Sequence, residues 1–310
     1  MPEQASLAIE DARPYEVLCD SRAPEWLELR NTGIGASDIA VVLGLSPWKT
    51  PFQLWAEKTG LRPPDDLSDN EPVFWGSRLE SIIVEVFGER TKRPVLRAGE
   101  LLRSRAHPWA LSTLDAWTGE GGPLWPLEIK TTSSRHADAW AEGPPDHYMA
   151  QVQQQLLVTG EERATVACLL GGQRLIWCDI EREERWINMI LRHGAEFWRL
   201  VEERDPPAVD GSRATTEALN DLFPADDGAA IVLPEAMRET VEELAELRAH
   251  KRLAEDKIRE CENTIKLALG RAPKGIFPGG LSVSWQSQTR KSYTVPEKTY
   301  RVLRVHEPKR

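Results

Sequence analysis

The stretch that decides the fold runs from residue 111 to residue 130 and reads LSTLDAWTGEGGPLWPLEIK. Both of its ends are apolar, and the glycine-rich run 119–122 between them is typical of a turn. The pattern predicts two strands, 110–117 and 124–131. If these strands pair antiparallel, Asp115 and Glu128 come close together. Because side chains alternate along a strand, Glu128 and Lys130 project from the same face.

Two carboxylates and one ammonium at a single place suit the metal-assisted hydrolysis of a phosphodiester. Mg²⁺ prefers oxygen ligands and keeps several of its waters, and Mn²⁺ is an alternative. We predict a metal held by Asp115, Glu128 and the main-chain carbonyl of Ile129. The metal lowers the pKa of a bound water. Lys130 then orients that water or stabilises the charge that develops during the reaction.

A Glu-x-Lys triplet in a strand has a simpler explanation. By itself it is more often part of a solvated face that carries a weak ion pair. The neighbours argue against this here, because Leu114, Leu127 and Ile129 are apolar and indicate buried strands. Charged residues among buried strand residues need a functional reason.

Periodicity divides the rest of the chain into further elements. Helices are expected at 37–43, 51–60, 73–90, 146–158 and 183–204, and strands at 95–103, 163–170 and 173–180. The fold class is therefore α/β, with a central mixed β-sheet flanked by helices. We expect an N-terminal arm over 1–24, a core over 25–206, a linker over 207–234, a long helix over 235–270 and a small basic region over 271–310. A hairpin around 281–287 and 299–305 is expected in that last region.

The long helix carries a heptad-like apolar stripe that includes Leu244, Leu247, Ile258 and Ile265. Such a stripe is typical of coiled coils. It favours self-association or partner binding, and packing of the helix on its own domain is an equally good explanation.

Charge does not by itself point to a nucleic-acid partner. The net charge is −10, from 39 Lys and Arg against 49 Asp and Glu, whereas nucleic-acid binders are usually basic. The distribution is uneven, however. Residues 181–262 hold 21 acidic and 12 basic residues, while 88–107 hold six basic against two acidic ones, and 288–310 hold seven against two. A local basic surface is therefore compatible with the sequence.

The cysteines and the absence of a long apolar run bear on location. Cys19, Cys168, Cys178 and Cys261 form no CxxC pair, and we expect reduced thiols. No apolar run approaches transmembrane length, and the first 30 residues lack the apolar region of a signal peptide. We expect a cytoplasmic protein.

Four sequence blocks resemble one nuclease family. They are RNTGIGASDI at 30–39 with SPW at 46–48 and FQLW at 52–55, WGSRLE at 75–80, Asp115 with EIK at 128–130, and YMAQVQ at 148–153. Their order is similar to that of the YqaJ-type viral recombinases, which include lambda exonuclease and belong to the PD-(D/E)XK nuclease superfamily. The blocks cover about half of the chain. One departure is that Leu114 stands where the superfamily motif has proline.

The resemblance implies a restriction-endonuclease-like core and adds residues to the site. Glu80 matches a helix-borne acid near the metal, and Gln151 matches a polar residue beside it. Arg30 and Ser37 match a pair that holds a DNA 5′-phosphate. Val73 falls where the family places an apolar wedge that splits the DNA end. Without the resemblance, Arg30 and Ser37 would read as a surface arginine and a helix cap.

The implied function is a Mg²⁺-dependent exonuclease that degrades linear double-stranded DNA from an end, 5′ to 3′, and leaves 3′ single strands. The resemblance also implies a toroidal trimer, a single-strand annealing partner, and a phage or prophage origin in a bacterial host. Two alternatives stay open. One is an endonuclease or repair nuclease of the same fold, and the other is a non-catalytic DNA-binding or scaffolding module.

Overall fold

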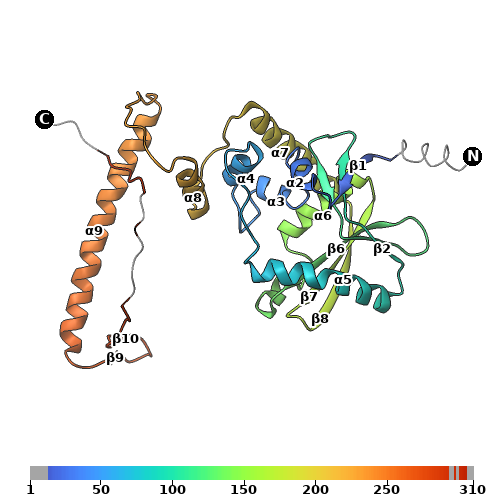
Figure 1. The fold of residues 1–310 in the computed structure, drawn as a ribbon. Helices are drawn as coiled ribbons and strands as arrows, with labels where there is room; N and C mark the ends of the chain where they lie inside the picture. The colour runs from blue at the N-terminus through green and yellow to red at the C-terminus, as the bar shows by residue number, and fades with distance from the viewer. Residues whose placement is uncertain (1–12, 293–296, 298–299, 306–310) are drawn as a thin grey trace, which may run out of the picture. The chain divides into compact units, whose positions relative to one another are not determined.

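The computed structural model describes residues 13–292, 297 and 300–305, and the chain divides into two units, 1–222 and 223–310 (Figure 1). The first unit is built on a five-stranded sheet in the order β2-β5-β6-β7-β8. Its strands are β2 (Val95–Arg97), β5 (Ala116–Thr118), β6 (Trp125–Thr132), β7 (Arg163–Leu170) and β8 (Arg174–Glu181). All neighbours pair antiparallel except β6 and β7, which are parallel. The expected mixed sheet is confirmed.

A second, three-stranded sheet has the order β1-β3-β4. It contains β1 (Tyr15–Asp20), β3 (Glu100–Ser104) and β4 (Leu111–Thr113). The expected strands 95–103 and 110–117 are therefore each broken, because the chain changes sheets at Gly99 and again at Leu114 and Asp115. Gly99 makes this possible with a φ of 142°, a backbone conformation that favours glycine.

The expected arm over 1–24 is wrong for its second half. Residues 15–20 form β1 and pair antiparallel with β3, while residues 1–12 lie outside the described part of the chain. This strand shows weak alternation, so its partner, more than 80 residues later, is what stabilises it. Pairing of that kind leaves no local signal in the sequence.

Helices cover both faces of the main sheet. They are α2 (Trp26–Arg30), α3 (Ile39–Val42), α4 (Pro51–Lys58), α5 (Glu71–Thr91), α6 (Asp146–Thr159), α7 (Glu184–Glu203) and a 3₁₀ segment η1 (Ser134–Trp140). The start of α4 is set by a capping box, in which the Thr50 hydroxyl accepts from the Gln53 amide and the Gln53 side chain accepts from the Thr50 amide. The start of α5 is capped by the side chain of Asn70.

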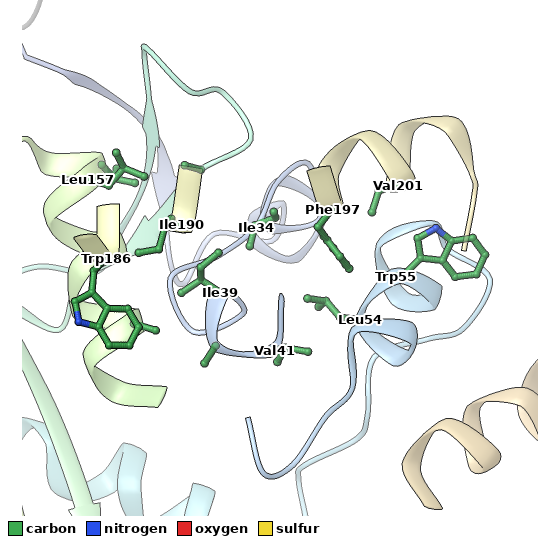
Figure 2. Packing of buried hydrophobic residues seen from close by; sticks show 14 of the residues in the cluster. Ile34, Ile39, Val41, Leu54, Trp55, Leu157, Trp186, Ile190, Phe197 and Val201 are labelled. Atoms are coloured by element: carbon green, nitrogen blue, oxygen red, sulfur yellow. The ribbon is translucent and has the colours of Figure 1, made fainter. Parts of the chain in front are cut away.

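Three apolar clusters hold these layers together. On one face of the sheet, Phe87 of α5 packs with Leu127 and Ile129 of β6. On the other face, Leu156 of α6 packs with Val166 of β7. The largest cluster joins α3, α4, α6 and α7, and Figure 2 shows its side chains meeting between these helices. The alternation along β6 therefore sends apolar residues toward α5 and leaves Glu128 and Lys130 on the α6 side.

The expected linker over 207–234 contains a helix, α8 (Arg213–Leu222), which belongs to the first unit. Ala218 is fully buried, and the hydroxyls of Thr215 and Thr50 lie 3.1 Å apart. The polar character of this stretch concealed the helix, because only its narrow inner face is buried.

The second unit holds α9 (Met237–Leu269) and a hairpin of β9 (Lys274–Ile276) and β10 (Ser282–Ser284). The long helix is confirmed. The expected hairpin is wrong in its partner, since β10 pairs with β9 and residues 300–305 form no strand. Closing the short loop between β9 and β10 costs less chain entropy than reaching residue 299. Residues 298 and 299 lie outside the described part.

The four cysteines are free thiols, as expected. Among the described residues, no helix combines the length and apolar character that a membrane span requires.

The α5 contact with the sheet gives a stability prediction. Phe87 is fully buried, whereas Phe74 on the same helix is 44% exposed. We expect Phe87→Ala to lower the free energy of unfolding by about 3–5 kcal/mol, because it removes buried area and leaves a cavity. Urea denaturation of the full chain measures this. Phe74→Ala is the matched control, and equal losses for both variants would contradict the assignment of this core.

Candidate active site

Asp115 and Glu128 meet because β5 and β6 pair antiparallel. The register matches Ala116 with Leu127, which brings the preceding residue, Asp115, opposite Glu128. The Asp115 carboxylate accepts a hydrogen bond of 2.7 Å from the main-chain amide of Ile129 through Oδ2. Asp115 itself lies at the point where the chain leaves the small sheet for the large one, so its position is fixed by both.

Glu128 is the most buried charge of the site, with 2% of its surface exposed. Its Oε1 accepts from Lys130 Nζ at 2.5 Å and from Gln151 Nε2 at 2.6 Å. Its Oε2 accepts from Gln155 Nε2. Lys130 Nζ also donates to Gln151 Oε1 at 3.0 Å and lies 4.8 Å from the centre of the Tyr148 ring. Strand β6 and helix α6 therefore build this network together.

The carboxylates open into a cavity of about 610 Å³. Its lining includes five residues predicted for the site, namely Asp115, Glu128, Ile129, Lys130 and Glu80. Val73, predicted as the wedge, lines the same cavity from the first turn of α5 and is 43% exposed. Residues of β6 and α5, together with Asp115 just before β5, thus line one space.

The electrostatics of the cavity favour a bound cation. Burial raises the pKa of Asp115 well above its ordinary value, and the negative charge of Glu128 raises it further. Burial also raises the pKa of Glu80, again with a contribution from Glu128. Burial lowers the pKa of Lys130, but Glu128 and Asp115 outweigh this and raise it, so the ammonium stays charged. Three carboxylates thus face one cation.

The donor set fits a hard divalent metal. Asp115 Oδ2 is held by Ile129, and among the described residues Oδ1 accepts no hydrogen bond. Within that same part of the chain, no three carboxylate, imidazole or thiol side chains are close enough to enclose a metal by themselves. Asp115, Glu128 and Ile129 line the same cavity, and carboxylate and carbonyl oxygens are the ligand type that Mg²⁺ prefers.

A smaller pocket of about 180 Å³ adjoins this site through Gln151, which lines it together with Arg30 and Ser37. Arg30 Nη2 donates to the Ser37 hydroxyl at 2.9 Å and to Asp38 Oδ1 at 2.9 Å. The predicted pair is therefore brought together. Ser37 lies two residues before α3, which is only four residues long, so the helix dipole at this pocket is weak.

Asp38 and Lys58 hold Arg30 in position. Lys58 Nζ lies 3.0 Å from Asp38 Oδ2 and donates to the Arg30 carbonyl at 3.0 Å. Burial alone would raise the pKa of Asp38, but Arg30 and Lys58 hold it well below its ordinary value, so it stays ionised. Arg30 and Lys58 share the single carboxylate of Asp38. Burial lowers the pKa of Lys58, and Arg30 lowers it further. Arg30 is the charged side chain that lines the pocket, and its guanidinium suits an anion.

The loop that carries this pocket depends on close backbone approach. A Cβ atom at Gly33 would lie 2.6 Å from the Trp109 carbonyl, closer than such atoms come. Ile34 is held between Trp109 and Leu111 by main-chain hydrogen bonds, and its carbonyl accepts from Gln154. Helix α6 therefore supports both the carboxylate network and the arginine pocket.

Three residues of the site were not found from the sequence. Gln155 lies outside the family-like block 148–153, although its spacing of four from Gln151 puts both on one side of α6. Asp38 falls at the start of the expected helix 37–43, a position typical of a cap, but its side chain makes no cap and binds Arg30 and Lys58. Lys58 gave no signal, because a lysine near a helix end is expected to be solvated.

Comparisons with known proteins identify the family. A model of the YqaJ-like viral recombinase domain matches residues 25–162. The "Uncharacterized protein YqaJ" of Bacillus subtilis (strain 168) is 36% identical over 268 residues, which cover 84% of this chain and 82% of that protein. The chain belongs to the YqaJ family. All four sequence blocks lie within the matched domain, so the resemblance found from the residues is confirmed.

Solved structures show the same fold as the YqaJ domain. The alkaline exonuclease LHK-Exo from Laribacter hongkongensis, solved alone and in complex with dAMP, aligns with a TM-score of 0.50 and 22% identity. Each alignment covers 59% of this chain and 94% of the other. The restriction-endonuclease-like fold class is therefore shown, with the long C-terminal helix as an addition.

The crowded carboxylates give a second stability prediction. Asp115→Asn removes a poorly solvated negative charge while an amide oxygen still accepts from Ile129. We expect a higher melting temperature without divalent cations, on the order of 3 °C for about 1 kcal/mol in a unit of this size. We also expect Mg²⁺ to stabilise the wild type and not the variant. Thermal melts with Mg²⁺ or EDTA test this, with the exposed Asp205→Asn as control. A variant that melts lower in EDTA would contradict it.

Proposed function

We propose that this YqaJ-family protein is a divalent-metal-dependent DNA exonuclease that shortens one strand of linear duplex DNA from a 5′ end. The observation that carries the proposal is the joint position of Asp115, Glu128 and Lys130 in one cavity, next to a positively charged pocket that contains Arg30. The fold shared with an alkaline exonuclease supports the reaction class, and the YqaJ-like viral recombinase family supports a role in recombination.

The proposed metal, Mg²⁺ or Mn²⁺, would be held by Asp115, Glu128 and the Ile129 carbonyl. When bound, it supplies a water of lowered pKa and neutralises charge on the phosphate. Lys130 donates hydrogen bonds and, because its pKa is raised, acts as a fixed cation and not as a base. It orients the attacking water and stabilises the charge on the phosphate oxygens. Gln151 and Gln155 hold Glu128 in place.

Arg30 carries the proposal of end recognition. Its guanidinium, fixed by Asp38, would bind a 5′-phosphate with the Ser37 hydroxyl as a second donor. The pocket shares Gln151 with the catalytic network, so a phosphate there lies next to the cleavage site. A pocket of this kind serves an enzyme that starts at an end and is of no use to one that cuts internally. Val73 would separate the terminal base pair, and the product would be a 3′ single strand.

Assembly belongs to the same proposal. A trimer that encloses DNA and a single-strand annealing partner are the arrangements that the family resemblance implies. Helix α9 supports an association role, because none of its side chains is buried and Leu247, Ile258 and Ile265 of its apolar stripe are exposed. Exposed apolar stripes on long helices are typical of helix–helix contacts.

Catalysis can be tested with end-labelled linear duplex DNA. We expect degradation with Mg²⁺ and none with EDTA, and a loss of at least about 100-fold in rate for Lys130→Ala and for Glu128→Gln. The control is Lys257→Ala on α9, which removes an exposed lysine whose ion pair contributes little. Normal degradation by either site variant would overturn the catalytic assignment. Cleavage of covalently closed circles would favour an endonuclease, and absence of Mg²⁺ binding would favour a non-catalytic DNA-binding module.

End recognition can be tested with 5′-phosphate and 5′-hydroxyl ends. We expect the wild type to prefer the phosphate, and Arg30→Ala to reduce that preference about 10-fold or more, the effect of losing a charged hydrogen bond. Lys58→Met should also reduce the preference for the phosphate end, because the charge of Asp38 is then balanced by Arg30 only. Arg213→Ala, an exposed arginine of α8, is the control. Equal rates on both ends in the wild type would remove the phosphate pocket.

A further inference from the structure

Trp48 has no part in the proposed cleavage, yet it lines the same cavity as Asp115 and Lys130. It lies in the loop between α3 and α4, and 67% of its surface is exposed. A single exposed tryptophan needs no explanation. This one stands with Leu67, Val73 and Tyr148 on the wall of a cavity that otherwise carries charges, so the cavity has an aromatic and apolar side as well as an ionic one.

The Trp48 indole packs against two aromatic side chains of helix α6. Its ring meets the His147 ring edge to face, with centroids 5.1 Å apart and planes at 87°, and it lies 6.5 Å from the Tyr148 ring. The Tyr148 ring in turn lies 4.8 Å from Lys130 Nζ. The main-chain amide of Trp48 donates to the Ser46 hydroxyl at 3.3 Å, which tightens the loop. A continuous aromatic surface therefore extends from the catalytic lysine to solvent.

His147 reinforces the apolar character of this surface. Burial lowers the pKa of His147, and the charge of Lys130 lowers it further, so the imidazole is neutral at pH 7. The indole thus rests on an uncharged ring and keeps its other side available. Asp146, at the start of α6, acts in the opposite direction and has the smaller effect.

The ligand that fits such a surface is a flat ring joined to a phosphate. Nucleobases stack on aromatic side chains with little dependence on sequence, because every base has a π-face. A base within a duplex is already stacked and paired, so only an unpaired base can reach an indole. Val73 lines the same cavity, at the place where the proposed function separates the terminal base pair.

Trp75 is the other exposed tryptophan near the site, and it suits this role less well. Its indole N–H donates to Glu71 Oε2 at 2.8 Å, and its ring meets Phe74 edge to face. It does not belong to the lining of the cavity that holds the carboxylates. Trp48 and Trp75 are both more than half exposed and differ in position, which makes them a matched pair for experiment.

We propose that Trp48 is the stacking platform for an unpaired nucleobase of the DNA strand that enters the active-site cavity. The proposal rests on the proposed function for its choice of ligand. It assigns the cavity a base-binding subsite, in which affinity depends on the presence of a base and not on which base it is.

The test is a cycle that removes the tryptophan and the bases separately. The probe is a 5′-phosphorylated single-stranded oligodeoxynucleotide, either intact or lacking the bases of its first three nucleotides. Its binding to the full chain is measured by fluorescence anisotropy with Ca²⁺ in place of Mg²⁺. We expect Trp48→Ala to weaken binding of the intact strand by about 5- to 150-fold and to leave binding of the abasic strand unchanged. Trp48→Phe should retain most of the affinity.

Trp75→Ala is the control and should bind both strands as the wild type does, and melting temperatures check that the variants fold. Equal weakening of the intact and abasic strands by Trp48→Ala would overturn the proposal, as would a base-dependent loss confined to Trp75→Ala. Binding does not require cleavage. If Trp48→Ala weakens binding of the intact strand alone but the wild type does not degrade linear DNA, the base-binding subsite stands and the proposed nuclease function is contradicted. If the wild type degrades linear DNA but Trp48→Ala does not weaken binding of the intact strand, only the subsite is contradicted.

Discussion

The buried carboxylate of Glu128 is the interaction on which the arrangement of this molecule depends. A charge that is 2% exposed must be paired and hydrogen-bonded, or its burial costs several kcal/mol. Here Lys130 supplies the charge, and the amides of Gln151 and Gln155 supply the remaining hydrogen bonds. Two donors come from α6 and one from β6, so the helix must lie on this face of the strand. The hydrogen bonds that stabilise Glu128 therefore also fix the packing of α6 against β6.

The site also divides into two halves of opposite charge. Asp115, Glu128 and Glu80 line the large cavity with Lys130, whereas Arg30 is the charged side chain that lines the small pocket. Gln151, which is neutral, lines the boundary. In the proposed function, the metal would bind on the side of the carboxylates and the 5′-phosphate on the side of Arg30, so the two charges of the substrate complex would be separated.

Sequence reasoning was most successful where the determining contacts are local. The juxtaposition of Asp115 and Glu128 followed from one turn and the alternation along two strands, and the long helices followed from their apolar periodicity. It failed where a residue depends on a distant partner. Lys58 is buried only because Asp38 meets it from another element, and β1 exists only because β3 is beside it. The break at Gly99 could not be predicted for the same reason, because the two halves of the expected strand 95–103 pair in different sheets.

The parallel pairing of β6 and β7 has a consequence for the order in which the protein is made. Strand β6 carries Glu128 and Lys130, but its long register with β7 is completed only at Leu170. A nascent chain that ends before residue 163 contains every proposed ligand and lacks the strand that holds β6 in place. Since parallel pairing requires the whole crossover, a growing chain that ends before Arg163 cannot form the β6–β7 ladder. The strand that carries Glu128 and Lys130 therefore gains its second neighbour only when synthesis has passed β7.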